Sequence, residues 1–160
     1  MSGEMGGGPA TAPLAPDIPI LAPTAEFAYE ALVDIDLTLS LGRSPIGERR
    51  MVPILGGRFQ GPRIRGSIMG GGADRQLIRD DGVRQLEAIY EMRADDGAII
   101  SVRNNVLIHD FPGEPRYAFS TLAITAPEGP HDWLNKGVFV GTLQKPNELP
   151  QVLIRVFRLC

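Results

Sequence analysis

Residues 83–107 read VRQLEAIYEMRADDGAIISVRNNVL, and this stretch decides the fold. Two runs of alternating apolar and polar side chains, residues 83–93 and 98–107, flank the triplet Asp95-Asp96-Gly97. Alternation with a period of two is typical of a half-buried strand. Asp-Gly between two such runs indicates a hairpin, because glycine adopts the positive φ that a tight turn requires. The stretch therefore predicts a long antiparallel β-hairpin.

The same alternation continues on both sides of this hairpin. Residues 26–39 place an apolar side chain at every second position: Phe27, Tyr29, Ala31, Val33, Ile35, Leu37 and Leu39. Shorter strands are expected over residues 48–55, 58–69, 77–78, 116–124, 138–143 and 151–159, with one helical turn over 130–136. Hairpin-like connections favour a closed antiparallel β-barrel of about eight strands, because closure removes exposed edges. An interior of eight strands either fills with side chains or holds one small ligand.

The N-terminal segment has a different composition. Residues 1–24 consist largely of glycine, alanine and proline, and repeated prolines oppose both helix and sheet. This predicts a flexible, disordered tail followed by a barrel domain over residues 25–160. An alternative is an arm that lies along a neighbouring subunit, held by Ile18, Ile20 and Leu21.

Charge and composition bear on partners and cofactors. Sixteen Lys and Arg against nineteen Asp and Glu give a net charge of −3, which opposes a general nucleic-acid surface. The single cysteine, Cys160, permits no internal disulfide, and neither a metal cluster nor a cofactor fingerprint stands out. Apolar runs are too short for a membrane-spanning helix. We therefore expect a cytoplasmic protein without metal, cofactor, nucleic-acid or membrane partner.

Asp74 is the first candidate for a catalytic role. It follows Gly70-Gly71-Gly72 closely, so the backbone can hold its carboxylate at the start of a strand. At the mouth of an apolar cavity, desolvation would raise its pKa and make it a usable general acid or base. The alternative is a turn aspartate that accepts hydrogen bonds from neighbouring amides.

Two further acid–base candidates are His131 and Tyr90. His131 precedes Trp133 at an alternate position, so a proton-transfer group would lie beside a wall for a flat ligand. Equally, Trp133 would plug the barrel end and leave His131 exposed. Tyr90 offers a hydroxyl to the cavity if its strand turns Leu86, Ala88 and Met92 inward.

Polar residues on other strands are candidates for substrate binding. Asn105 and Arg103 share one strand face, and Arg65 is a possible partner for an oxyanion or carboxylate. The alternative for Tyr90, Asn105 and Arg103 is an outward sheet face packed on a second subunit, and for Arg65 a solvated or interface position. The chain is expected to form a homo-oligomer, a dimer or larger.

A series of short motifs in residues 47–107 carries a family resemblance. In order these are Gly47-Glu48-Arg49-Arg50, Pro53-Ile54, Gly56-Gly57, Gly61-Pro62, Gly66, Gly71-Gly72-Ala73-Asp74, Asp81-Gly82, Asp95-Asp96-Gly97-Ala98, Ile100 and Val102-Arg103-Asn104. Pro23 with Glu26-Phe27 and Trp133-Leu134-Asn135 extend the match. The chain thus resembles the domain-of-unknown-function 3237 family, also called uncharacterised protein family 0311.

The resemblance implies a self-associating β-barrel of about eight strands, similar to other small barrels that bind or isomerise apolar metabolites. It implies no settled activity. In the family pattern an acidic residue often stands where this chain has Ile124-Thr125, and an aromatic hydroxyl stands near His131. Any role of that acid is in doubt here, whereas His131 would supply a different acid–base group.

These observations lead to one leading hypothesis and two alternatives. The leading hypothesis is a cofactor-independent isomerase, cyclase or lyase for a small apolar or aromatic metabolite, in which Asp74 moves the proton. The first alternative is a barrel that binds such a ligand without converting it. The second is an oligomeric interaction protein with a filled interior.

Overall fold

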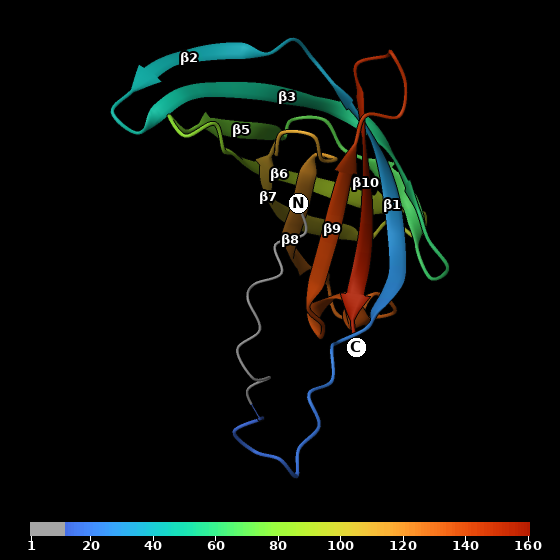
Figure 1. Cartoon of the computed structure of the whole chain (residues 1–160). Helices are drawn as coiled ribbons and strands as arrows, with labels where there is room; N and C mark the ends of the chain where they lie inside the picture. The colour runs from blue at the N-terminus through green and yellow to red at the C-terminus, as the bar shows by residue number, and fades with distance from the viewer. Residues whose placement is uncertain (1–11) are drawn as a thin grey trace.

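The computed structural model describes residues 12–160, which wrap into a β-barrel (Figure 1). The strands are β1 (Ala25–Ile35), β2 (Leu39–Ser44), β3 (Gly47–Gln60), β4 (Arg65–Ile68), β5 (Ala73–Ile78), β6 (Arg84–Ala94), β7 (Ile99–His109), β8 (Tyr117–Thr125), β9 (Phe139–Gln144) and β10 (Gln151–Leu159). A four-residue 3₁₀ helix, η1 (Asp132–Asn135), precedes β9. Every strand pairing is antiparallel, so the predicted all-β antiparallel class is confirmed.

The strands occupy eight positions around the barrel. Strands β6 to β10 follow one another as neighbours, and β1 closes the ring by pairing with both β10 and β3. Strands β4 and β5 lie one after the other between β3 and β6. Strands β1 and β2 likewise pair with successive parts of β3. The prediction of a closed barrel of about eight strands is therefore confirmed.

Several strands differ from the sequence prediction. Strand β2 was not predicted, β5 begins at Ala73 rather than at residue 77, and residues 58–69 divide between the end of β3 and β4. The first strand ends at Ile35 instead of continuing to residue 39, and an irregularity between Phe27 and Tyr29 changes which side chains face inward. Phe27 and Leu37 are accordingly exposed although the simple alternation placed both on the apolar face. Strand β3 is continuous where a break was predicted at Gly56-Gly57. A Cβ on Gly57 would lie 2.2 Å from the Leu32 carbonyl oxygen, so glycine here permits close pairing with β1.

One half of the barrel interior is filled by side chains. Tyr29, Phe59, Met92, Ile100 and Phe139 belong to this buried cluster. The helix η1 crosses the same end and inserts Leu134, which is 1% exposed. This half of the barrel is therefore a closed, packed core.

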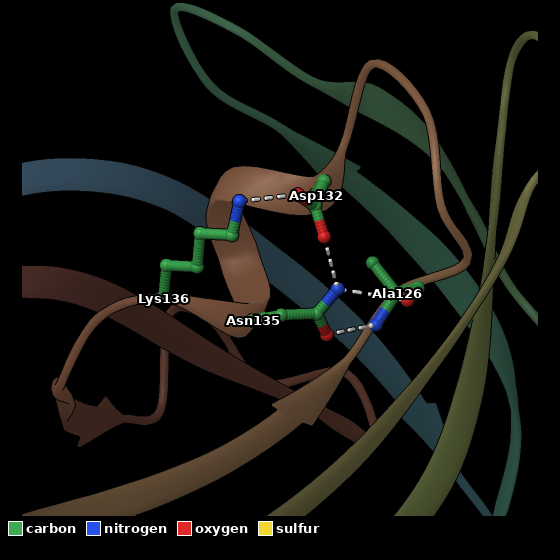
Figure 2. Close-up of polar contacts among 4 residues, drawn as sticks. All are labelled: Ala126, Asp132, Asn135 and Lys136. Carbon is green, nitrogen blue, oxygen red and sulfur yellow. Dashed lines mark hydrogen bonds and ion pairs between the residues drawn. The ribbon is translucent and has the colours of Figure 1, made fainter.

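Asn135 fastens η1 to the end of β8 (Figure 2). Its Oδ1 accepts a hydrogen bond from the Ala126 amide at 2.8 Å, and its Nδ2 donates to the Ala126 carbonyl at 2.9 Å. The same Nδ2 donates to Asp132 at 3.0 Å, and Asp132 also pairs with Lys136 at 2.7 Å. The helical turn predicted over residues 130–136 thus acts as a tethered plug.

The segment before β1 runs away from the barrel (Figure 1). Residues 12–24 contain turns and extended backbone but no strand, and Ile18, Ile20 and Leu21 are exposed. Only at its end does the segment join the sheet, where Thr24 and Cys160 exchange backbone hydrogen bonds. The rest of the predicted tail, residues 1–11, lies outside the described residues. Within residues 12–160, no helix has the length and apolar character needed to cross a membrane.

Candidate functional site

A cavity of about 190 Å³ occupies the half of the barrel opposite η1. It reaches the rim, because its lining includes Ile35 at the end of β1, Arg84 at the start of β6 and the exposed Arg116. Aliphatic side chains form most of the wall: Val33, Ile35, Val52, Ile54, Leu86, Ala88, Val106, Ile108, Leu143, Val152 and Ile154. The polar lining consists of Asp74, Gln76, Arg84, Tyr90, Asn104 and Arg116.

The strand register places Asp74 and Asn104 in one row across the cavity wall. Asp74 on β5 is opposite Ala88 on β6, and Ala88 is opposite Asn104 on β7. Side chains at paired positions point to the same face of a sheet, so all three face inward. The small Ala88 between them leaves space above it. The carboxyl and amide groups therefore lie on either side of Ala88 in the cavity wall.

Asp74 is the central titratable group of this cavity. Its Oδ1 is buried without a hydrogen-bond partner among the described residues, whereas Oδ2 accepts a hydrogen bond from Gln76 Nε2 at 2.8 Å. Burial raises the pKa of the Asp74 carboxyl, and the Gln76 hydrogen bond opposes this rise only in part. The alternative of a turn aspartate satisfied by backbone amides does not match this environment.

Tyr90 lies one inward position deeper on β6. A Cβ on Gly72 would approach the Tyr90 Cβ to 2.7 Å, so the glycine preceding β5 permits a close approach to β6 at this residue. The Tyr90 hydroxyl is buried and unpartnered within the described part of the chain, and burial raises its pKa. Tyr90 is therefore a neutral hydroxyl that is free to donate a hydrogen bond to a ligand. Leu86 and Met92 on the same strand also face inward, which is the condition under which Tyr90 was expected to reach the cavity.

Asn104 was not selected from the sequence, which favoured its neighbour Asn105. The structure buries Asn104 to 2% exposure and turns Asn105 outward. The signal was available: Val102, Asn104 and Val106 alternate with Arg103 and Asn105, so the apolar partners of Asn104 identify the inner face. Gln76, Arg84 and Arg116 were also missed. The positions of Gln76 and Arg84 at the cavity depend on the register of β5 with β3 and β6, and Arg116 directly precedes β8.

His131 does not join Asp74. It lies at the closed end, where its Nε2 contacts Oδ2 of Asp96 in the β6–β7 turn at 2.7 Å. Asp96 also accepts a hydrogen bond from the Ala98 amide. This bond lowers the pKa of the Asp96 carboxyl, and the hydrogen bond with His131 lowers it further, by a smaller amount. His131 is buried rather than exposed, and its Nδ1 has no partner among residues 12–160. In this position it connects the η1 plug to the hairpin turn.

Trp133 and Arg65 also lie at the closed end. Trp133 packs 6.1 Å from Phe139, measured between ring centroids, and the Arg63 guanidinium stacks 4.4 Å above its ring. Arg65 is exposed and lines a surface depression together with Asp96 and His131. Neither residue lines the cavity that contains Asp74. The predicted grouping of Asp74 with Trp133 and His131 is therefore not found.

Asn105 and Arg103 lie on the outer face of the barrel. Asn105 lines a wide groove outside β6 to β9, together with Glu87, Leu107, Phe119 and Val140. Arg103 is exposed on the same face of β7. This location corresponds to the alternative in which the two residues face away from the cavity.

The described residues 12–160 contain no group of three or more His, Cys, Asp or Glu side chains arranged to hold a metal ion. The polar groups of the cavity are one carboxyl, one phenol, two amides and two guanidinium groups. These groups can transfer a proton, donate hydrogen bonds and bind an anion.

The family model described as "Protein of unknown function (DUF3237)" matches residues 23–159. The chain belongs to this family. A DUF3237 relative from Clostridium acetobutylicum, a UPF0311 protein, is 28% identical over 149 residues, which cover 84% of this chain and 92% of that protein. The family predicted from the sequence motifs is thus confirmed.

Solved structures share the barrel. A conserved protein of unknown function from Rhodopseudomonas palustris superposes with a TM-score of 0.80 at 28% identity, covering 88% of this chain and all of the other. A protein described as an enzyme from Penicillium herquei superposes with a TM-score of 0.73 at 20% identity, covering 89% of this chain and 98% of the other. The second likeness establishes the shared fold alone.

Proposed function

We propose that this DUF3237 protein is a cofactor-independent acid–base enzyme, an isomerase, cyclase or lyase, that acts on a small apolar or aromatic metabolite inside the barrel. The observation that carries the proposal is the unpartnered Asp74 carboxylate oxygen in an aliphatic cavity beside two other unpartnered polar groups, Tyr90 and Asn104. Buried polar atoms without partners cost free energy, and they are uncommon in folded proteins. A ligand that supplies the missing hydrogen bonds explains why they are present.

Proton transfer by Asp74 is the chemistry that fits this arrangement. The ionised carboxylate removes a proton from a substrate carbon next to a carbonyl, or from a hydroxyl, and becomes a neutral acid. The neutral acid then returns the proton to another substrate atom, so that no external oxidant or reductant is needed. Because burial raises the pKa of Asp74, the carboxylate is a stronger base than an exposed aspartate.

Tyr90 and Asn104 are positioned to stabilise charge on the substrate. The Tyr90 hydroxyl stays protonated, since its pKa is raised, and donates a hydrogen bond to an oxygen that becomes negative when Asp74 removes the proton. The Asn104 amide, in the same row as Asp74, orients a second polar group of the substrate. His131, Trp133, Arg65, Asn105 and Arg103 have no part in this step.

Cavity size limits the substrate class. A volume of about 190 Å³ is comparable with an engineered protein cavity of about 150 Å³ that binds benzene. The aliphatic wall favours a molecule with one ring or a short branched chain. The enzyme from Penicillium herquei supports the idea that this barrel can host chemistry, but only as an analogy of fold.

Conversion of metabolites in deuterated buffer tests the proposal. Purified protein is incubated with a small-molecule extract in D₂O, and mass spectrometry follows compounds that are consumed, formed or deuterated. We expect the wild-type chain to act on at least one compound, Asp74→Asn to lose at least a hundred-fold in rate, and Tyr90→Phe to lose about ten-fold or more. Tyr29→Phe is the matched control, because Tyr29 is also buried with an unpartnered hydroxyl but does not line the cavity.

Equal turnover by wild type and Asp74→Asn would reject the proposal. A second function, ligand binding without conversion, is favoured by the predominance of aliphatic side chains in the cavity wall. In that case the same compound would be retained by wild type and by Asp74→Asn, with no product from either. Turnover that is lost in Asp74→Asn therefore indicates an enzyme, whereas retention of the ligand by both proteins without a product indicates a binding protein.

A further inference from the structure

Arg84 is a half-buried cation at the mouth of the cavity. It is the first residue of β6 and is opposite Ile78 on β5 and Ile108 on β7. Leu86, Ala88 and Tyr90 follow at alternate positions, so Arg84 begins the inward face of β6. A rise of about 3.4 Å per residue places its Cα roughly 13–14 Å from that of Ala88, the residue between Asp74 and Asn104.

The carboxylates near Arg84 pair with other arginines. Asp110 receives two hydrogen bonds from Arg116, at 2.7 and 3.1 Å. Glu48, which shares the strand row of Ile78 and Arg84, lies 3.8 Å from Arg50. No ion pair or side-chain hydrogen bond involves Arg84 within residues 12–160. Arg84 and Arg116 are thus the two guanidinium groups that line the mouth, and within residues 12–160 only Arg116 has a carboxylate partner.

The pKa of Arg84 reflects its burial and the charges around it. Partial burial and the positive charges of Arg116 and Arg50 lower the pKa of Arg84, and Asp110 opposes this effect. An arginine remains charged in proteins even when its pKa falls, so the guanidinium stays a cation. A bound anion would relieve both the lost hydration and the repulsion between the arginines.

We propose that Arg84, assisted by Arg116, binds the carboxylate of the substrate, so that the metabolite is a small aromatic or unsaturated acid. The acid group lies at the rim, the apolar body lies along Leu86 and Val152, and the reacting end reaches Asp74 and Tyr90. A guanidinium matches a carboxylate through two parallel hydrogen bonds, and Arg84 has no carboxylate partner within residues 12–160. This inference rests on the proposed function, because it assumes that the cavity holds the substrate.

Calorimetric titration with cinnamate and cinnamamide tests the inference on the full chain. The two compounds have nearly the same shape and differ in charge. We expect wild type to bind cinnamate at least ten-fold more tightly than cinnamamide. Arg84→Gln should weaken cinnamate binding about ten-fold and leave cinnamamide binding unchanged, because a hydrogen bond to a charged group is worth about that factor.

Arg93→Gln is the matched control, since Arg93 lies on the same strand but on its exposed outer face. It should leave the affinity for both compounds unchanged. Equal binding of acid and amide by wild type, or an unchanged preference in Arg84→Gln, would overturn the inference. So would tighter binding of phenyl phosphate than of cinnamate, because it would replace the carboxylate by a different class of anion.

The outcomes separate this inference from the proposed enzyme activity. Asp74→Asn should bind cinnamate as tightly as wild type or more tightly, because it removes a negative charge from the same cavity. If acid and amide bind equally while Asp74→Asn still abolishes turnover of another compound, the carboxylate preference is wrong and the enzyme proposal stands. If neither compound binds at millimolar concentration, the carboxylate inference is overturned, whatever the turnover experiment gives.

Discussion

The environment of Asp74 combines features that oppose stability. Its carboxyl is partly removed from water, one oxygen has no partner in the described structure, and Gln76 provides a single hydrogen bond to the other. Natural proteins keep such costly groups at functional sites, where activity and stability conflict. A substitution of Asp74 is thus expected to affect both the proposed activity and the free energy of unfolding.

We predict that Asp74→Asn stabilises the protein at neutral pH. Asparagine is uncharged and its Oδ1 can still accept the Gln76 hydrogen bond, so the unfolding free energy should rise by about 1 kcal/mol, within the usual cost of a buried polar group that lacks a partner. Thermal unfolding of both proteins at several pH values measures the difference. At pH 7 the midpoint of the variant should be a few degrees higher.

The sign of the pH dependence follows from the raised pKa of Asp74. A carboxyl whose pKa is higher in the folded state favours folding at pH values below its unfolded pKa of about 3.9. That contribution is lost as the pH rises through the folded pKa. The advantage of Asp74→Asn should therefore shrink at acid pH; a variant that is less stable than wild type at pH 7 would contradict the burial described here.

Predictability from the sequence differed between neighbouring residues. The sequence left the inward and outward positions of Tyr90 open, and the structure turns it inward together with Leu86 and Met92, which share its alternation. Asn105 was preferred to Asn104 although the same rule, applied to Val102 and Val106, indicates Asn104 as the inward residue. Arg84 shares the alternation of Leu86 and Tyr90, which indicates its inward face, but its place at the cavity mouth also depends on the pairing of β6 with β5 and β7.

At the scale of elements, η1 closes one end of the barrel and leaves the other end accessible. The plug depends on Asn135, which makes three hydrogen bonds with Ala126 and Asp132 (Figure 2). Leu134 of the same helix packs among the buried apolar side chains of the core. The closed end therefore has a structural role, and His131 and Trp133 belong to it rather than to the cavity.

We predict that Asn135→Ala lowers the unfolding free energy by about 2 kcal/mol, because the backbone groups of Ala126 lose their partners. Chemical denaturation measures this change. Lys136→Ala provides the control: it removes only an exposed ion pair with Asp132 and should leave the midpoint nearly unchanged. Equal effects of the two substitutions would show that the Asn135 contacts do not hold the plug.

The pattern of strands was predictable where alternation is regular and failed where the backbone is irregular. The β6–β7 hairpin follows the sequence pattern closely. In β1, the irregularity between Phe27 and Tyr29 reverses the face of Phe27. A simple alternation of apolar and polar residues does not predict such an irregularity. In β3, Gly56-Gly57 permits close pairing with β1 instead of ending the strand. The contact is between strands distant in sequence, so the local sequence does not predict whether these glycines break the strand or continue it.

At the scale of the whole molecule, the outer groove suggests how two copies would meet. Phe119 is 51% exposed and Leu107 is 39% exposed, and both line the groove outside β6 to β9. Exposed apolar surface of this kind is a common feature of protein–protein contacts. The oligomer expected from the sequence stays a prediction, and this face is the part of the described surface that we expect it to use.

Light scattering during size-exclusion chromatography measures the oligomeric state. We expect wild type to have at least twice the 17.3 kDa mass of one chain and Phe119→Glu to shift toward the monomer. Leu37→Glu is the control, because Leu37 is 82% exposed but does not line the groove. A monomeric wild type would contradict the expected assembly, whereas an oligomeric Phe119→Glu would place the contact elsewhere.

The central claim is that the barrel interior holds a desolvated carboxyl suited to proton transfer. A pH titration of ¹³C-labelled aspartate side chains by NMR tests it most directly, with the Asp74 signal assigned by its loss in Asp74→Asn. We predict that Asp74 titrates above the ordinary value of about 3.9, and that Asp96, held by the Ala98 amide and His131, titrates below it in the same spectra. An Asp74 pKa at or below the ordinary value would contradict the account, because the carboxyl would then be an ordinary solvated aspartate.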